Sequence, residues 1–542
     1  MNCALDIIGV FGKSRQVMIS KISSVENRKY TPNRDAQDQQ QPAFQGLGEL
    51  FLQGVQACER NPMLNVSVLD LSTAIVPRSI IETKQSNAYA GMEAFRRESS
   101  GLIVNCLLPG YIVMGIAALL GKTGAFKDVK GMSGVLANEE SLKVVQKYLT
   151  NAQGTGEERL NHAITNFLND LTGVDGSSKK AFKDFDLELG VKKLVKSAQK
   201  PTARLRKPRK LFDRGYRDIA NATHMTEHLE LDGKVLSKNL KGYLEDFVNV
   251  HKAVEKNGVK GADNLAKFIQ KSIKLVNWKS ALGMFAIIPL AISMQPLNRW
   301  LTAKQSGVKG APIYKDYGDD KNNKELTPQE KAALLKQKFV SIGSMLAVAF
   351  LSMGCKLPGK EMLQFKGVFP TMDQARIIST ATFASRMAVA EDKNELREAT
   401  VRDIATFSSL YFLGDYAAKG VATLIEKVKP DVKLLNSVKE LPKDANMWKK
   451  LVHWVKDVSL KSSDEVVGKA AKNLRSVCQL GNLAFSLLAL GVFIPLYTRT
   501  QTNKKREAEL KQLAASINST DGFLKDQIKN NSPTFKSFFS LQ

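Results

Sequence analysis

The sequence lacks the residue spacings on which most metal and redox proteins depend. Its five cysteines stand at positions 3, 58, 106, 355 and 478, and no two lie within ten residues of each other. This excludes CxxC motifs, and nothing in the pattern suggests a disulfide framework, which fits loops in a reducing compartment. The cysteines are expected to be small buried apolar side chains. The chain also has no P-loop, no GxGxxG turn in a βαβ pattern, no GxSxG elbow and no kinase motif. These absences favour a non-enzymatic role, and nothing in the sequence requires a cofactor.

Acidic residues are few compared with basic ones. The chain has 79 Lys and Arg against 53 Asp and Glu, which gives a formal net charge of +26. Such an excess favours anionic partners, either nucleic acid or anionic lipid surfaces. No zinc-finger spacing or RNP pattern supports nucleic acid, so anionic lipid headgroups are the preferred partner. In a membrane protein the same excess also marks loops on the cytoplasmic side.

The N-terminal 100 residues lack a convincing signal peptide, because Asp6 interrupts the apolar start and no basic residue precedes it. We therefore expect a cytoplasmic N-terminus, with a tail and flexible linker at 1–43 and a cytoplasmic region at 44–100. Alternation of apolar and polar residues at 64–68 predicts a half-buried strand. The apolar run that follows ends at Pro77 and is too short to span a membrane.

The dominant feature is a stretch of 21 uncharged residues at 101–121, which as a helix would be about 31 Å long, close to the thickness of a bilayer core. Four further apolar segments follow within a membrane region at 280–498, and a basic, polar tail occupies 499–542. These segments are 280–298, 339–355, 404–425 and 476–498. The expected fold is mainly α: a multi-span helical membrane protein with four to five apolar helices and a helical, basic soluble domain.

The stretch at 101–121 has Pro109 and Gly110 at its centre, so two arrangements stay open. It either crosses the membrane or folds back as a re-entrant hairpin. The hairpin keeps the N-terminus and the following basic region on one side, as the positive-inside tendency favours.

Residues 122–279 form the largest region without an apolar span and predict a helical domain. Four apolar stripes follow the 3.6-residue period and are typical of bundle core. They comprise Leu142, Val145 and Leu149; Leu160, Ile164, Phe167, Leu168 and Leu171; Leu236, Leu240, Tyr243, Leu244 and Phe247; and Leu265, Phe268, Ile269, Ile273 and Val276.

The densest positive charge lies at 192–217 and predicts an anion-binding surface. The same residues could equally form a solvated basic loop or contact nucleic-acid phosphates. The candidate anion-binding residues are Lys192, Lys193, Lys196, Lys200, Arg204, Arg206, Lys207, Arg209, Lys210, Arg214 and Arg217.

Two smaller constellations suggest other chemistry. Asp415 and Lys419 are four residues apart within an apolar segment. Ionisable groups in such a segment often serve ion or proton paths. The two side chains could instead neutralise each other or be exposed to solvent.

The string from His224 to His228 resembles the HxxEH motif of inverzincin metalloproteases, in which Glu227 would activate a zinc-bound water. That resemblance covers five residues, a further ligand is not evident, and no metal site is assigned.

Three functions follow from these patterns. The preferred one is a non-enzymatic, multi-pass membrane protein whose basic helical domain binds anionic lipid or acts as a scaffold. The alternatives are a transporter or channel that uses Asp415 and Lys419, and a membrane zinc metalloprotease that uses His224 and His228.

Overall fold

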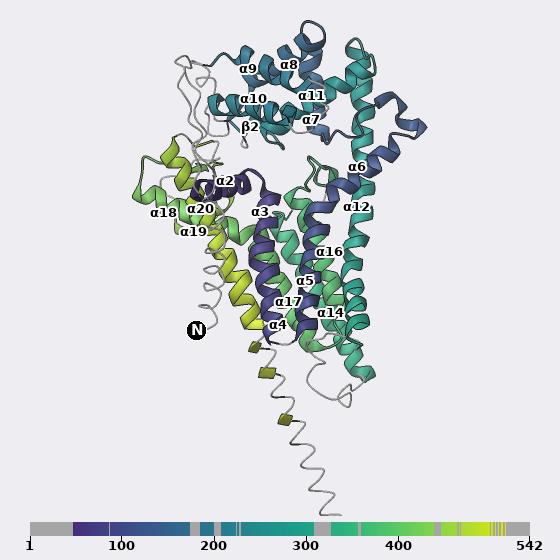
Figure 1. Ribbon diagram of the computed structural model, residues 1–542, viewed down its shortest axis with the longest axis vertical. Helices are drawn as coiled ribbons and strands as arrows, with labels where there is room; N and C mark the ends of the chain where they lie inside the picture. The colour runs from purple at the N-terminus through teal and green to yellow at the C-terminus, as the bar shows by residue number, and fades with distance from the viewer. Residues whose placement is uncertain are drawn as a thin grey trace, which may run out of the picture. The chain divides into compact units, whose positions relative to one another are not determined.

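The computed structural model describes residues 47–85, 87–173, 185–199, 207–223, 225–226, 229–307, 327–355, 359–437, 446–462, 465–466, 468–498, 500–501, 504–505, 508, 511–512 and 515. Contacts divide the chain into two units, Met1–Phe51 and Leu52–Gln542, and nearly all described residues belong to the second. The structure is mainly helical, as the sequence predicts (Figure 1).

The helices, including short π-helical (η1, η2, η6, η7) and 3₁₀ (η3) turns, follow in chain order. They are α2 (Leu47–Arg60), α3 (Pro62–Leu69), η1 (Asp70–Ile75), α4 (Val76–Gln85), α5 (Ala88–Leu102), η2 (Ile103–Leu107), α6 (Leu108–Leu120), η3 (Gly124–Val129), α7 (Glu139–Asn151), α8 (Gly156–Asp170), α9 (Leu187–Gln199), α10 (Lys207–Thr223), α11 (Leu240–Lys256), α12 (Ala262–Ser306), α14 (Pro328–Ser352), α15 (Lys360–Leu363), α16 (Met372–Val389), α17 (Lys393–Ser408), η6 (Ser409–Leu413), α18 (Gly414–Val428), α19 (Met447–Lys456), α20 (Lys469–Ser486) and η7 (Leu487–Phe493).

The described strands are short and form two small antiparallel sheets. The first has the order β1 (Thr172–Gly173), β2 (Leu229–Leu231), β3 (Lys234–Val235), with Thr172 opposite Glu230. The second pairs β4 (Leu435–Ser437) with β5 (Val458–Leu460). Each sheet closes a connection between helices rather than forming a layer of its own.

Helices α7 to α11 and the first turns of α12 surround one apolar core, and we call this part the helical domain. The predicted stripes are confirmed, because all of their residues are buried in this core except Ile273, which packs against it. Tyr148, Phe167, Tyr243 and Phe247 form its centre, with ring centroids 5.1–6.3 Å apart. Helix α7 begins at Glu139, where Asn138 caps it in a capping box with Ser141.

Within the described residues, five helical stretches are long and apolar enough to cross a membrane. They are Pro62–Lys84, Ala88–Leu120, Ala262–Ser306, Pro328–Ser352 and Ala470–Thr498. We call these five stretches, together with α16, α17 and α18, the bundle. In Figure 1 α4 lies beside α5, and α12 lies beside α16, which also contacts α14 and α17.

The first of these stretches, Pro62–Lys84, is helical throughout. The predicted strand at 64–68 and the predicted break at Pro77 are therefore wrong. Asn61 caps α3, its side chain accepting a hydrogen bond from the Leu64 amide at 3.2 Å, and Pro62 stands in the first turn, where a missing N–H costs nothing. The helix then continues through η1 and Pro77 to Lys84. A helix cap at 61 outweighs the alternating pattern that indicated a strand.

Three of the prolines inside these helices follow a π-helical turn, whereas Pro289 and Pro296 lie within α12 without one. η1, η2 and η7 each finish two residues before a proline, at Pro77, Pro109 and Pro495 respectively. In a regular α-helix the proline ring collides with the carbonyl four residues earlier. A π turn widens the helix at that carbonyl and so accommodates the ring.

The π turn η2 lies just before Pro109, within the stretch 101–121 for which the sequence left two arrangements open. The chain does not fold back at Pro109 and Gly110: Ala88–Leu120 is one helical stretch, in which α6 begins at Leu108 with Pro109 in its first turn. The re-entrant hairpin is therefore wrong. The predicted segment 404–425 also differs, since it lies in the helical run α17–η6–α18, which is not among the five spanning stretches.

Glycines allow the bundle helices to approach closely. A Cβ at Gly283 of α12 would collide with Val113 of α6, and one at Gly110 would collide with the carbonyl of Val368. A Cβ at Gly491 would lie only 2.9 Å from the carbonyl oxygen of Thr73, the carbonyl that precedes Pro77 by four residues. Small residues at helix crossings are typical of membrane bundles, where close packing drives association.

Apolar side chains cover the outside of the bundle. Large exposed residues on α12 and α14 include Trp278, Phe285, Ile292, Leu297, Trp300, Leu335, Phe339, Val340, Leu346, Phe350 and Leu351. Phe285 is 77% exposed and Phe339 is 69% exposed. Trp278 and Trp300 are 22 residues apart, which is about 33 Å along a helix and matches the two interfaces of a bilayer.

Candidate functional site: a buried ion-pair network in the bundle

Glu98 is the centre of an ion-pair network inside the bundle. Its Oε1 accepts hydrogen bonds from Arg78 Nη1 at 3.3 Å and Arg97 Nε at 3.1 Å, and its Oε2 accepts one from Arg386 Nη2 at 3.2 Å. Glu98 and the two more distant arginines, Arg78 and Arg386, have side chains no more than 5% exposed. One carboxylate therefore joins α4, α5 and α16.

The network continues through Arg386 to α17. Arg386 Nη1 lies 3.4 Å from Asp403 Oδ1, and Arg402 Nε donates to the same oxygen at 3.0 Å. Arg402 Nη1 lies 4.0 Å from Glu398. Arg78 also reaches α17, since its Nη2 donates to Thr406 Oγ1 at 2.5 Å. Buried charges are tolerated only when paired and hydrogen-bonded, so these contacts tie four helices together.

A second ion pair lies beside this network. Arg299 of α12 pairs with Glu395 of α17 and lies 3.7 Å from Glu93 of α5. The side chains of all three are less than 15% exposed. The pair connects the longest helix to the helices that hold the network.

A small cavity adjoins the network on the side of Asp70. It measures about 20 Å³ and is lined by Asp70, Glu98, Asn105, Cys106, Ser379, Arg386 and Tyr411, together with apolar residues. That volume is enough for about one water molecule. Two hydrogen bonds fix its polar wall: Thr382 donates to Asn105 Oδ1 at 2.9 Å, and the hydroxyls of Ser379 and Tyr411 are 2.6 Å apart.

Local sequence explains why these side chains converge. Ser379, Thr382 and Arg386 are three and four residues apart on α16, so they lie on one face of that helix. Three π-helical turns supply the opposite wall: Asp70 from η1, Cys106 from η2 and Tyr411 from η6. Such turns expose backbone carbonyls and are frequent at functional sites.

This arrangement combines a fixed electrostatic framework with one carboxylate outside the direct ion pairs. The guanidinium groups hold the carboxylates of Glu98 and Asp403 in place through charge-assisted hydrogen bonds. Asp70 is only half-buried and lines the cavity. A carboxylate next to a water-sized cavity can exchange a proton or hold a cation, which the arginines cannot do.

None of the candidate residues predicted from the sequence belongs to this network. Asp70 lies in the apolar run that the sequence predicts to be too short to span a membrane, and Arg78 directly follows its end at Pro77. A partial signal exists at Arg386, which stands ten residues after Arg376 in the otherwise uncharged second half of α16.

The eleven predicted anion-binding residues lie on or between α9 and α10, which pack against each other. Lys193, Lys196, Arg214 and Arg217 are exposed, and exposed Lys192 pairs with Glu188 at 2.9 Å. Lys200, Arg204 and Arg206 lie outside the described residues. Lys207, Arg209 and Lys210 belong to the first turn of α10. Whether these residues bind an anion stays a prediction.

The side chains of Asp415 and Lys419 lie in different environments. Asp415 is exposed, whereas Lys419 is 6% exposed. The Lys419 ammonium donates to the Val455 carbonyl at 3.4 Å and lies 4.5 Å from the Trp454 ring centroid. Lys419 is therefore directed towards α19 and serves to dock that helix onto α18.

The HxxEH string lies between α10, which ends at Thr223, and β2, which begins at Leu229. His224, Glu227 and His228 are outside the described residues. Elsewhere in the described part of the chain, no group of three or more His, Cys, Asp or Glu side chains could hold a metal ion.

Comparisons with protein-family models, with curated proteins and with solved structures found no match to this chain.

Proposed function

We propose that this chain is a non-enzymatic, multi-span membrane protein whose basic helical domain lies against an anionic membrane surface, where it acts as a lipid-anchored scaffold. One observation carries the proposal: the bundle has apolar side chains outside and paired charges inside. Water would make that arrangement unfavourable, because large exposed apolar patches associate. A bilayer makes it favourable, because lipid covers the outer face while the ion pairs stay buried.

The proposed topology begins with two antiparallel crossings, Pro62–Lys84 and Ala88–Leu120. Because two crossings return the chain to its starting side, the segment before Pro62 and the helical domain share one side. This satisfies the positive-inside tendency without a re-entrant hairpin. Ala262–Ser306 then crosses to the side opposite the helical domain, and Pro328–Ser352 crosses back. Ala470–Thr498 crosses once more, so the C-terminal tail lies on the side opposite the helical domain.

The helical domain is assigned to the cytoplasmic side because it contains the densest basic segment. Its exposed lysines and arginines on α9 and α10 face outward from the core, where lipid headgroups can reach them. Near an anionic leaflet each such residue contributes about 1 kcal/mol of attraction.

Single-cysteine labelling tests the topology. In a background without the other native cysteines, Lys130→Cys, Lys456→Cys and native Cys355 should react with a membrane-impermeant reagent from one side. Lys84→Cys, Lys331→Cys and Lys504→Cys should react from the other. Labelling of positions 130 and 504 from the same side would overturn the five-crossing arrangement.

A fluorophore at Lys193→Cys tests the lipid contact. In nanodiscs that contain anionic lipid, a headgroup-attached quencher should reduce its emission more strongly than in neutral nanodiscs, and added salt should reverse the difference. Equal quenching in both lipids would contradict contact between the helical domain and anionic headgroups.

A second candidate function is an ion or proton path, and the cavity beside Asp70 favours it over the Asp415 and Lys419 hypothesis. In proteoliposomes with a pH gradient, Asp70→Asn should abolish any protein-dependent proton flux, whereas exposed Asp431→Asn should leave it unchanged. Absence of flux from the unsubstituted protein would exclude a proton path.

A further inference from the structure

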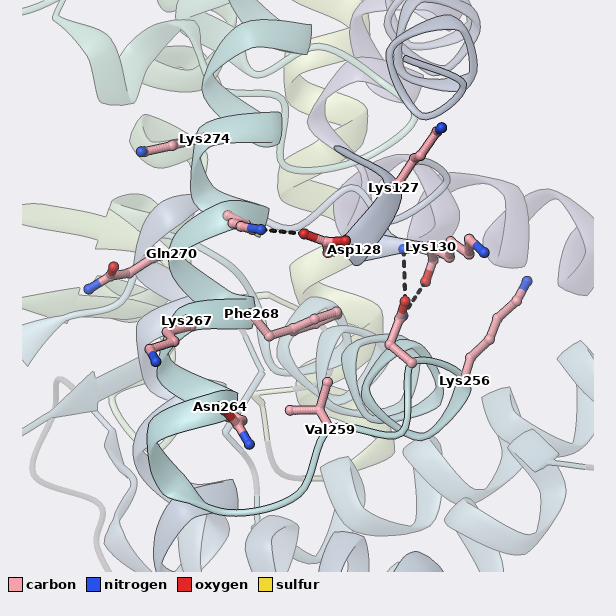
Figure 2. Close-up of a pocket in the computed structure, with 12 residues that line it drawn as sticks. Lys127, Asp128, Lys130, Lys256, Val259, Asn264, Lys267, Phe268, Gln270 and Lys274 are labelled. Carbon is pink, nitrogen blue, oxygen red and sulfur yellow. Dashed lines mark hydrogen bonds and ion pairs between the residues drawn. The ribbon is translucent and has the colours of Figure 1, made fainter. Parts of the chain in front are cut away.

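We propose that a lysine-rich pocket at the start of α12 binds a compact, multiply phosphorylated group, such as a phosphoinositide headgroup. The pocket is formed by η3, the turn between α11 and α12, and the first turns of α12 (Figure 2). This inference deepens the proposed function and rests on it, because it identifies where the helical domain would hold a lipid. It lies outside the α9–α10 segment that the sequence indicated.

The pocket has a volume of about 660 Å³ and a strongly positive lining. Six lysines line it, namely Lys127, Lys130, Lys256, Lys267, Lys271 and Lys274, against one acid, Asp128. Within the described residues, only the ammonium of Lys271 pairs with that acid. Lys271 holds the pKa of Asp128 below its usual range, so the acid stays ionised beside it. Six lysines against one aspartate leave a net charge of +5.

The wall of the pocket is held by the backbone rather than by the lysine head groups. Asn257 Nδ2 donates to the Lys130 carbonyl at 2.7 Å, and the Lys130 amide donates to Asn257 Oδ1 at 3.2 Å (Figure 2). Gly131 and Gly258 adopt φ of +92° and +60°, which other residues rarely adopt, and so shape the two turns at this wall. The backbone at Lys130 is therefore held in place without use of its ammonium group, and in the described part of the chain Lys271 is the one lining lysine that pairs with the acid of the pocket.

The position of the pocket on α12 indicates a membrane-borne ligand. Lys267, Lys271 and Lys274 lie on one face of α12 at intervals of four and three residues. Trp278 continues that face one turn later and is 59% exposed. Lys274 is thus about 6 Å along the helix from an aromatic residue typical of the bilayer interface. A headgroup in the pocket would keep its acyl chains beside the bundle.

The chemistry of the lining fits a compact anion that carries several phosphates. Ammonium groups bind phosphate oxygens as point charges, and several phosphates are needed to neutralise several lysines. Phe268 is 4% exposed and belongs to the apolar core, so it offers no stacking surface for a nucleic-acid base. A compact polyanion fits this pocket better than a nucleotide or a nucleic-acid strand.

The experiment uses the full chain in nanodiscs, with phosphatidylinositol bisphosphate, phosphatidylglycerol or phosphatidylcholine as the probe lipid. The test variant is the triple substitution Lys267→Gln, Lys271→Gln and Lys274→Gln. The matched control is Lys427→Gln, Lys429→Gln and Lys433→Gln, which removes the same charge from exposed positions at the end of α18 and in the loop after it, outside the helical domain. Affinity for the bisphosphate lipid should fall at least about tenfold in the test variant and less than about twofold in the control.

Soluble inositol trisphosphate and inorganic phosphate distinguish the possible sources of the phosphates. Weak competition by both supports a lipid ligand, whereas competition by inositol trisphosphate as strong as by the lipid identifies a soluble ligand and overturns the lipid assignment. Equal losses in the two triple variants, or no loss in the test variant, would overturn the pocket. Cysteine labelling of the same variants reports the topology separately, so failure of the pocket and failure of membrane insertion give different results.

Discussion

The helical domain and the bundle bury opposite kinds of side chain. The domain has an apolar centre, with Phe167 and Tyr243 fully buried and lysines outside. The bundle exposes Phe285 and Phe339 and buries ion pairs. Both parts are helical and belong to one chain, so helix formation does not explain the difference. The surrounding solvent does: water favours the first distribution and lipid the second.

Each region contains buried charge, but in different amounts. In the domain, Lys238 and Asp246 form an isolated pair at 2.5 Å, with both side chains 5% exposed. Burial raises the pKa of Asp246, and the Lys238 ammonium opposes that rise. In the bundle, three acids and four arginines form a connected network. The domain thus contains a local pair, whereas the bundle depends on charges for contacts between helices.

The largest expected effect comes from breaking the network at Arg386. Arg386→Leu removes the partner that Glu98 and Asp403 share and should destabilise the bundle by about 3–5 kcal/mol, because each of these buried carboxylates loses a charged hydrogen-bond donor. Thermal unfolding of the protein in detergent measures the loss. Arg386→Lys, which keeps the charge, should lose less, and exposed Arg214→Leu should change stability by less than about 0.5 kcal/mol. Equal melting temperatures for Arg386→Leu and the unsubstituted protein would show that the network is not required.

The next effect tests which solvent each surface contacts. Leu346 on α14 is 54% exposed and Val235 on β3 is 61% exposed. A lysine at 346 should cost about 2.5–3.5 kcal/mol of insertion free energy if that face contacts lipid. A lysine at 235 should have no effect, because that residue faces water. The yield of chain that resists alkaline extraction from membranes measures both. Similar yields for the two variants would remove the distinction between the regions.

A smaller effect is expected at the helix crossings. Gly283→Leu forces α12 away from Val113 and should cost about 1–3 kcal/mol through overpacking. Gly343→Leu is the matched control, because no atom lies within 4 Å of the added Cβ. Size-exclusion profiles after heating should separate the two variants. If Gly343→Leu is the more damaging, the assignment of packed and lipid-facing sides is reversed.

The smallest effect concerns a titratable group in the helical domain. Burial lowers the pKa of His251, whose side chain is 4% exposed. Its neutral form is favoured in the folded state, so stability is present above the unfolded pKa of about 6.5 and declines as pH falls below it, by at most about 1.4 kcal/mol per pH unit. Melting temperatures at pH 7.5 and 5.5 should differ more for the unsubstituted protein than for His251→Gln. An equal difference in both would assign the pH dependence to another group.

Sequence alone predicted the helical domain well and the bundle less completely. Leu160 and Ile164 lie on one helix turn, so their shared burial follows from local periodicity. Glu98 contacts Arg78, 20 residues earlier, and Arg386, 288 residues later. Linear patterns do not contain that proximity. Pro77 was misread because the relief of its steric clash comes from the π turn before it, which residue propensities do not encode.

Helix α12 is a single element of 45 residues that contributes to both regions. Its lysine stripe and Arg299 lie on one continuous helix, which contains Pro289 and Pro296, so their angular register depends on the number of residues between them. One residue inserted between Lys274 and Trp278 would rotate the pocket by about 100° relative to the bundle and raise it by about 1.5 Å. The number of residues in α12 therefore determines which way the positive pocket faces when Trp278 and Trp300 lie at the bilayer surfaces.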